Sequence, residues 1–177
     1  MHKNIKIQLS ETQHISAVHF VRAKTKAKNK DQKTEKPNTL TIMIHSFPGY
    51  KAGTGDIFAD LEFDLPPYEY DTLRFDFRGC GDSSGHQEQF SFKSASIDMK
   101  AVLNWAKQQK YERIFYIAEG LGSTIALMNI DDLVRGFVFL WPAISPFDTA
   151  IKDAFSIAKK APEGENYAAV SYTHLTL

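Results

Sequence analysis

Three short segments of the chain carry side chains that could do chemistry. They are residues 45–49 (HSFPG), residues 76–85 (DFRGCGDSSG) and residues 118–123 (AEGLGS). Between them they hold hydroxyls, an imidazole, carboxylates, a guanidinium and a thiol, the groups that nucleophilic and acid–base catalysis use. They can act together only if the fold brings the three segments to one place.

Each of these segments directly follows a predicted buried strand. Continuous apolar runs rich in β-branched and aromatic residues occupy residues 40–44, 73–77, 114–118 and 137–141. Such runs are typical of strands buried on both faces of a parallel sheet. Alternating residues within 4–22 instead predict two half-buried strands that form a hairpin.

Segments with helical periodicity separate the buried strands. The clearest follows a capping residue at Ser91 and has one apolar face, made of Ala95, Met99, Val102 and Ala106. A shorter helix is predicted from Leu121, Ile125 and Met128. A weaker one is predicted over residues 54–63 and ends before Pro66 and Pro67.

This alternation of strands and helices predicts one α/β domain with a doubly wound, mostly parallel sheet and an N-terminal β-hairpin. In such sheets, ligands bind beyond the carboxyl ends of the strands. The three segments all follow strand ends, so we expect them to meet at that edge.

In their order and spacing, the segments resemble the loops of the α/β-hydrolase fold family, in particular its esterase, monoglyceride-lipase and serine-aminopeptidase-like branches. In that family an H-G-[FW]-x-G loop follows the third strand and a D-x-R-G-x-G-x-S loop follows the fourth. A G-x-S-x-G elbow joins the fifth strand to the next helix. The resemblance covers residues 4–150 and implies a hydrolase sheet truncated before its last strands.

The resemblance implies an oxyanion hole made by the backbone N–H groups of Phe47 and Leu121. The other residues expected to line or shape the site are His45, Ser46, Gly49, Asp76, Arg78, Gly79, Gly81, Ser83, Glu119 and Gly122. For the second loop we favour a structural role, in which glycines allow a tight turn and Arg78 pairs with Asp82.

The elbow departs from the family pattern at its apex. Ala118 and Gly122 are the small residues that the sharp turn needs, but the nucleophile position between them is Gly120. Ser123 is expected about one turn into the helix, with its hydroxyl directed away from the elbow. Glycine relieves about 1–3 kcal/mol of backbone strain at such a position. The substitution is therefore structurally comfortable, but it removes the attacking group.

The acid and the histidine that complete the family's triad also lack a match. Asp148 comes too early for the acid, and His174 stands alone. Residues 170–177 (VSYTHLTL) look like the translation of a sequencing-library adapter. We therefore expect residues 1–169 to be the N-terminal portion of a single hydrolase domain and residues 170–177 to be a non-native tail. Truncation would account for the missing acid and histidine, but not for Gly120.

Three classes of function remain open. The first is an ester or amide hydrolase, which would need a nonstandard nucleophile or an activated water; the 177-residue chain is then expected to be inactive. The second is a noncatalytic homologue that binds an acyl or carbonyl ligand. The third is a nucleotide-binding oxidoreductase, suggested by Gly79, Gly81 and Gly85, although their spacing is not G-x-G-x-x-G.

Neither a metal nor a cofactor is predicted. His14 and His19 point to opposite faces of a strand, so they cannot converge on one ion. His45 and His86 are each expected to be bonded locally within their loops. Arg78 lies near enough to Cys80 to lower the pKa of the thiol, but we favour a small packed thiol there.

Composition and charge limit the partners. The chain is 43% hydrophobic and 24% charged, which is typical of a globular domain. Twenty-one basic residues balance twenty-one acidic ones, so no attraction to nucleic acid or to a membrane is expected. Residues 23–38 are Lys-rich but contain no aromatic residue for base stacking, so we interpret them as an exposed loop.

The single cysteine and the absence of a signal-peptide pattern favour a cytoplasmic protein. The oligomeric state of the protein is left open.

Overall fold

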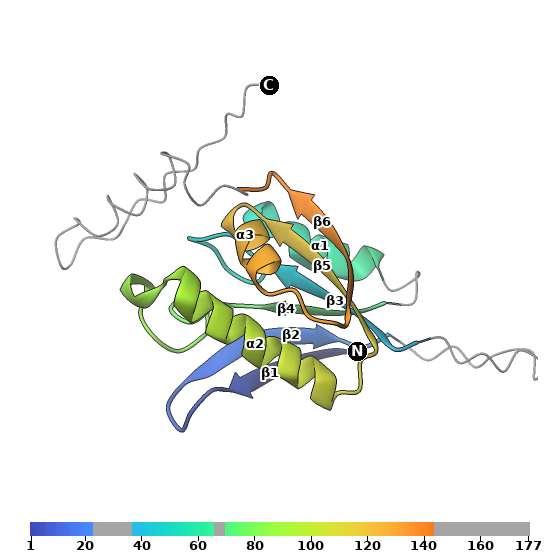
Figure 1. Cartoon of the computed structure of the whole chain (residues 1–177), viewed down its shortest axis with the longest axis horizontal. Helices are drawn as coiled ribbons and strands as arrows, with labels where there is room; N and C mark the ends of the chain where they lie inside the picture. The colour runs from blue at the N-terminus through green and yellow to red at the C-terminus, as the bar shows by residue number, and fades with distance from the viewer. Residues whose placement is uncertain (23–36, 66–69, 144–177) are drawn as a thin grey trace, which may run out of the picture. The chain divides into compact units, whose positions relative to one another are not determined.

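A computed structural model of the protein describes residues 1–22, 37–65 and 70–143. Several sequence predictions lie outside these ranges: the tail at 170–177, Asp148, His174 and residues 23–36 of the Lys-rich loop. The described residues form one twisted sheet with helices packed on it (Figure 1).

Six strands form the sheet in the order β1–β2–β4–β3–β5–β6. Their bounds are β1 His2–Gln8, β2 His14–Phe20, β3 Thr39–Ile44, β4 Asp71–Phe75, β5 Arg113–Glu119 and β6 Val134–Leu140. β1 and β2 form an antiparallel hairpin, and β2 pairs antiparallel with β4. β4, β3, β5 and β6 run parallel to one another. The predicted hairpin and the mostly parallel α/β sheet are therefore confirmed.

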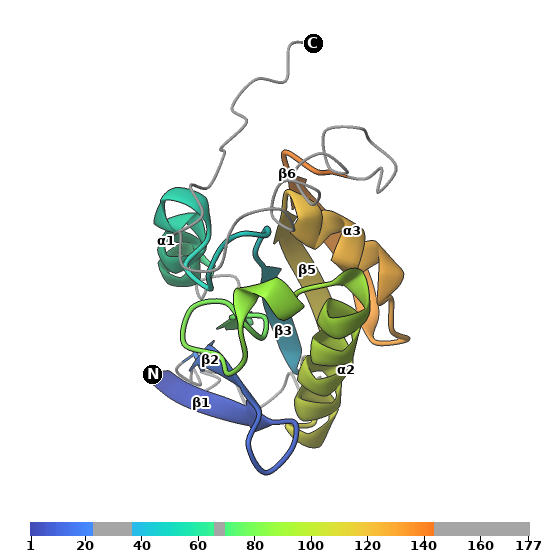
Figure 2. The same cartoon turned by 90° about the vertical axis from the view of Figure 1, so that its left-hand side faces the viewer.

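Helices cover both faces of the central strands. Figure 2 shows α1 (Ile57–Asp64) on one side of β3 and β5, and α2 (Phe92–Gln108) and α3 (Leu121–Met128) on the other. Every residue of β3 is buried, as its continuous apolar run predicts. Short 3₁₀ helices precede two of the α-helices: η1 (Thr54–Asp56) before α1 and η3 (Gln87–Gln89) before α2. Among the described helices, none has the length and apolar character needed to cross a membrane.

The helix predicted to follow Ser91 is α2, and both its cap and its buried face are confirmed. Ser91 Oγ accepts a hydrogen bond from the N–H of Ser94 at 3.0 Å, which satisfies one of the free amides at the start of α2. The buried face includes the four predicted residues, Ala95, Met99, Val102 and Ala106. The shorter helix predicted from Leu121, Ile125 and Met128 is α3; Leu121 and Ile125 are buried in it, whereas Met128 is 55% exposed.

Two strands differ from their predicted bounds. β4 ends at Phe75 and not at Phe77, because the N–H of Phe77 bonds to a ring nitrogen of His45 and not to a neighbouring strand. β6 begins earlier than predicted, and its expected burial on both faces is wrong. Phe137 is 38% exposed and Val138 is 52% exposed, because β5 is the one described strand that pairs with β6.

Candidate active site

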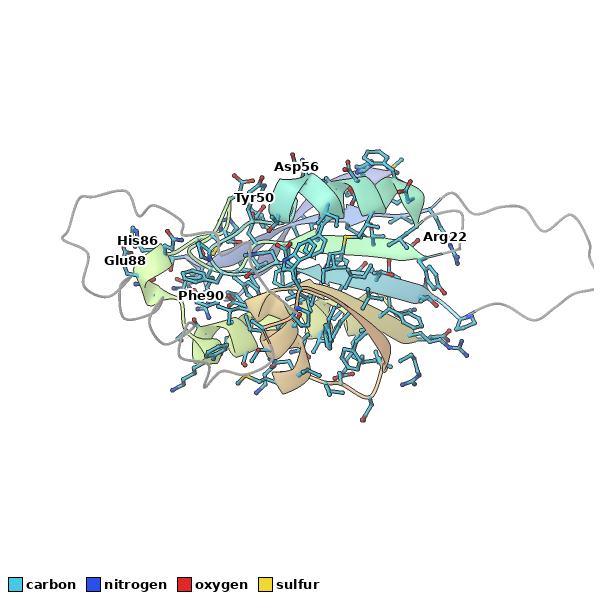
Figure 3. The ribbon with its side chains drawn as sticks, turned by 90° about the horizontal axis from the view of Figure 1, so that it is seen from above. Arg22, Tyr50, Asp56, His86, Glu88 and Phe90 are labelled. Carbon is cyan, nitrogen blue, oxygen red and sulfur yellow. The ribbon has the colours of Figure 1, made fainter. Side chains whose placement is uncertain are left out.

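The three chemistry-bearing loops meet at the carboxyl ends of β3, β4 and β5. The N–H of Phe77, after β4, donates to Nε2 of His45, after β3, at 3.1 Å. The N–H of Leu121, after β5, donates to Oγ of Ser46 at 3.2 Å. Figure 3 shows Tyr50 and Phe90 toward this end of the sheet and Arg22 toward the other end. The predicted convergence of the loops is therefore observed.

The turn from β5 into α3 is a sharp elbow with Gly120 at its apex. Gly120 has φ 49° and ψ −125°, a conformation that side-chain-bearing residues rarely adopt. At Gly122, an added Cβ would lie 2.4 Å from Ile44 O and 2.6 Å from His45 O. The start of α3 thus packs so closely on the end of β3 that residue 122 must be glycine.

The side-chain space of residue 120 is occupied by Ser46. A Cβ added at Gly120 would lie 2.4 Å from Ser46 Oγ and 2.9 Å from Ser46 Cβ, closer than real Cβ atoms approach. The same Oγ accepts the hydrogen bond from the Leu121 amide. Ser46 and Gly120 are both half-buried. The elbow therefore does have a hydroxyl beside it, supplied by the loop after β3.

Ser123 does not supply that hydroxyl. It is buried, and its Oγ donates to Ala118 O at 3.3 Å, back toward the end of β5. This geometry agrees with the expectation that Ser123 is directed away from the elbow.

Glu119 positions the backbone of two loops around the elbow. Its carboxylate is buried, and Oε1 accepts from the N–H of Ser46 at 3.3 Å. Both carboxylate oxygens also accept from the N–H of Thr54, at 3.2 and 3.1 Å. Thr54 was not predicted from the sequence, because it contributes a backbone amide and no residue type signals such a contact. Glu119 is thus a positioning residue for Ser46.

His45 is fully buried, and both of its ring nitrogens are bonded. Nε2 accepts from the N–H of Phe77, so Nδ1 carries the hydrogen and donates to Ser46 O at 2.5 Å. The expected local bond exists, but the second bond reaches another loop. Burial lowers the pKa of His45 to about 4, so the ring is neutral near pH 7. His45 therefore holds two loops together and cannot accept a proton from Ser46.

A buried carboxylate, Asp76, organises the second loop. Oδ1 accepts from the N–H of Lys51 at 2.6 Å, and Oδ2 accepts from Lys51 Nζ at 2.7 Å and from the N–H of Asp82 at 2.9 Å. Ser83 Oγ donates to Asp76 O at 2.6 Å. A Cβ at Gly81 would lie 2.3 Å from Asp76 Oδ2, which explains the glycine there. Lys51 was not predicted as a site residue, although it is the first lysine or arginine after the predicted strand at 40–44.

The predicted pair between Arg78 and Asp82 is wrong. Arg78 Nε donates to Asp98 Oδ1 at 2.6 Å, and the N–H of Arg78 donates to Asp98 Oδ2 at 2.9 Å. Asp82 instead pairs with Lys51 Nζ at 2.6 Å. Asp98 was missed, although an acid within the apolar face of α2 indicates a buried partner. The second loop is thus anchored on α2.

The alternative that Cys80 is a reactive thiolate is also wrong. The side chain is buried, at 5% exposed. Burial, together with the negative charge of Asp76, raises the pKa of the thiol to about 12. Cys80 is therefore a small packed thiol, which was the favoured interpretation.

An aromatic stack follows directly after Ser46. The rings of Phe47 and Phe90 are nearly parallel, at an interplanar angle of 10° and a centroid distance of 3.9 Å. Phe77 packs edge-on against Phe90 at 5.8 Å. Phe90, from the segment before α2, was not among the predicted site residues. The stacked rings of Phe47 and Phe90 are apolar surface in the loop next to the elbow.

His19, one of the histidines considered as a metal ligand, contacts a tyrosine hydroxyl. His19 Nε2 lies 2.7 Å from Tyr111 Oη, which donates to Asp71 Oδ2 at 2.8 Å. Burial lowers the pKa of His19. Within the described ranges, no group of three or more His, Cys, Asp or Glu side chains is arranged to hold a metal ion.

Solved structures with the same fold include several esterases. The chain is similar to the Pyrococcus furiosus esterase Pf2001, with a TM-score of 0.67 and 20% identity over 92% of this chain and 57% of that one. It is similar to Est1E from Butyrivibrio proteoclasticus, solved with ferulic acid bound, with a TM-score of 0.63 and 22% identity over 79% and 53%. The alpha/beta hydrolase GrgF from Penicillium sp. sh18 gives a TM-score of 0.68 and 14% identity over 90% and 53%.

At these identities the likeness shows the fold, and the chain spans little more than half the length of these three structures. No curated protein matches the chain in sequence. The family model described as the alpha/beta hydrolase fold matches residues 40–168, which include all three loops and the elbow. The match covers well over half of the sequence, so the chain belongs to the alpha/beta hydrolase fold family.

Proposed function

We propose that the whole protein acts on the acyl carbonyl of a carboxylic ester or amide, held at the elbow between the backbone amides of Phe47 and Leu121. The observation that carries this proposal is the direction of the Leu121 N–H. It points out of the elbow to a side-chain oxygen at 3.2 Å, as an oxyanion donor must.

The surroundings of the elbow suit an acyl group. The stacked rings of Phe47 and Phe90 offer apolar surface beside the amide donors. His45 is neutral and buried, so its role beside the elbow is to hold the loops in place. Glu119 keeps the loop that carries Phe47 in register with the elbow through its bond to the N–H of Ser46.

A second candidate is a noncatalytic homologue that binds an acyl or carbonyl ligand. It is favoured by the absence of a side chain at Gly120 and by the acceptor that already occupies the Leu121 amide. The inactivity of the 177-residue chain, which lacks a match for the acid and histidine of the triad, stays a prediction.

Hydrolysis of p-nitrophenyl esters of increasing acyl length separates the two candidates in the whole protein. We expect saturable release of nitrophenol above the buffer rate, and its loss after treatment with a phosphonate that mimics the tetrahedral intermediate. Tight binding of the fatty acid or its ester without cleavage would support the noncatalytic homologue. Saturable binding of a nicotinamide dinucleotide with no response to esters would overturn both.

A further inference from the structure

We propose that Ser46 is the nucleophile of this site, its hydroxyl having replaced one at the apex of the elbow. This inference rests on the proposed acyl-carbonyl function and names the group that attacks.

The position of Ser46 Oγ is the first argument. It lies 2.4 Å from the place where a Cβ on residue 120 would be. A serine at position 120 would carry its own Oγ one bond from that Cβ, so the two hydroxyls would need the same space. An attack from Ser46 therefore starts beside the point from which the family's serine attacks. Both Ser46 and Gly120 are half-buried.

The hydrogen bond from Leu121 is the second argument. An N–H that donates to Ser46 Oγ stabilises negative charge on that oxygen and so favours its nucleophilic form. In the tetrahedral intermediate, Oγ and the oxyanion are attached to the same carbon. A donor within reach of Oγ can therefore pass to the oxyanion with a small movement.

The other serines of these loops are engaged differently. The hydroxyls of Ser83, Ser84 and Ser123 donate to the backbone carbonyls of Asp76, His14 and Ala118. Ser46 Oγ instead accepts a hydrogen bond from Leu121, and among the described residues its own hydrogen is donated to no carbonyl. Ser46 thus has the uncommitted O–H that a nucleophile must give up to a base.

The backbone of Ser46 is held on both sides. Its N–H donates to Glu119 Oε1, and its carbonyl accepts from His45 Nδ1. The hydroxyl can then move only by rotation about its own side-chain bond, which keeps it next to the elbow.

The chemical step is an ordinary acyl transfer. Ser46 Oγ forms a bond to the acyl carbon to give a tetrahedral intermediate, whose collapse breaks the bond to the leaving alkoxide or amine. The Ser46 proton passes through an imidazole base to that leaving group. Water then cleaves the acyl–Ser46 ester and releases the acid. His45 cannot be the base because both of its nitrogens are bonded, so this role falls to an imidazole other than that of His45.

A fluorophosphonate probe tests the assignment in the whole protein. Ser46 Oγ displaces fluoride from phosphorus, and the label is located by mass spectrometry of peptides from the unmutated protein. We expect the label on Ser46 and a fall of at least about 100-fold in the labelling rate of Ser46→Ala, because that variant lacks the hydroxyl oxygen that attacks phosphorus. Ser10→Ala, in the turn between β1 and β2, is the matched control and should label at the unmutated rate.

Each outcome decides one of the two proposals. A label on a different residue, or an unchanged labelling rate in Ser46→Ala, would overturn the assignment of Ser46 and leave the acyl-carbonyl function standing. Absence of both labelling and ester cleavage in the unmutated protein would overturn the proposed function itself. The peptide map of the unmutated protein does not depend on any variant folding correctly.

Discussion

The hydroxyl oxygen of Ser46 lies 2.4 Å from the position that a Cβ on Gly120 would take. The family pattern has glycine second in the H-G-[FW]-x-G loop and serine at the elbow apex, and this chain has the two residue types exchanged. Gly120 leaves a space that the Ser46 side chain fills, so the packing of the two residues is coupled. The exchange also moves a hydroxyl without removing it from the elbow.

The first prediction concerns this exchange. Gly120→Ser alone should destabilise the protein, because the new side chain meets Ser46 and residue 120 has a positive φ; the strain is about 1–3 kcal/mol. In a Ser46→Gly background the same change should cost about 1–2 kcal/mol less. Urea unfolding of the four proteins of this cycle measures the coupling. Additive effects of the two substitutions would show that the residues do not compete for space.

The second prediction compares two acids on the same lysine. Asp76 is buried and accepts three hydrogen bonds through its carboxylate, so Asp76→Ala should lower the free energy of unfolding by about 3–5 kcal/mol. Asp82 is 79% exposed, so Asp82→Ala is the matched control and should unfold at nearly the unmutated urea midpoint. Equal losses in the two variants would mean that the exposed pair anchors the loop as strongly as the buried one.

The third prediction concerns pH. The pKa of His45 falls from 6.5 to about 4 on folding because the ring is buried. The unfolded state therefore binds more protons between these values, so this group's stabilisation is complete above pH 6.5 and is lost as the pH falls toward 4. His45→Gln keeps an acceptor for the N–H of Phe77 but does not titrate, so its stability should change less over this range. Thermal unfolding from pH 4 to 7.5 measures the difference, and parallel curves for the two proteins would contradict it.

The fourth prediction concerns Cys80. The thiol is buried and its pKa is raised to about 12, so almost no thiolate exists near pH 8. Ellman's reagent should therefore modify Cys80 only as fast as the protein opens, and at once in urea. Because Cys80 is the chain's one cysteine, the absorbance reports this residue alone. Rapid modification of the folded protein would show that the loop of residues 76–85 opens readily.

Much of the fold could be predicted from local patterns. The runs at 40–44 and 114–118 are buried strands because continuous apolar segments must be covered on both faces, and these two lie side by side with a further strand on each side. The run at 137–141 has the same pattern, but its strand lies at the edge of the described sheet. Apolar composition does not reveal whether a neighbouring strand is present, and this is why the burial of β6 was predicted wrongly.

Pairings between side chains could not be predicted in the same way. Arg78 and Asp82 are close in the sequence and have opposite charges, yet Arg78 reaches Asp98 on α2 and Asp82 reaches Lys51. Both actual pairs join segments that only the folded sheet brings together. Charge and sequence spacing limit the possible ion-pair partners of each residue, but the geometry of the folded loop determines which pairs form.

The sequence by itself determined the family, the elbow and the loss of a serine at position 120, because these follow from residue types at fixed local spacings. It also contained Ser46, but in a list of residues that shape the site and with no reason to rank it above the others. Only the tertiary structure decided that the Ser46 hydroxyl fills the space left by Gly120 and accepts the Leu121 amide. The physical reason is that this contact joins the ends of two parallel strands, β3 and β5, whose distance in space is set by sheet pairing and not by separation along the chain.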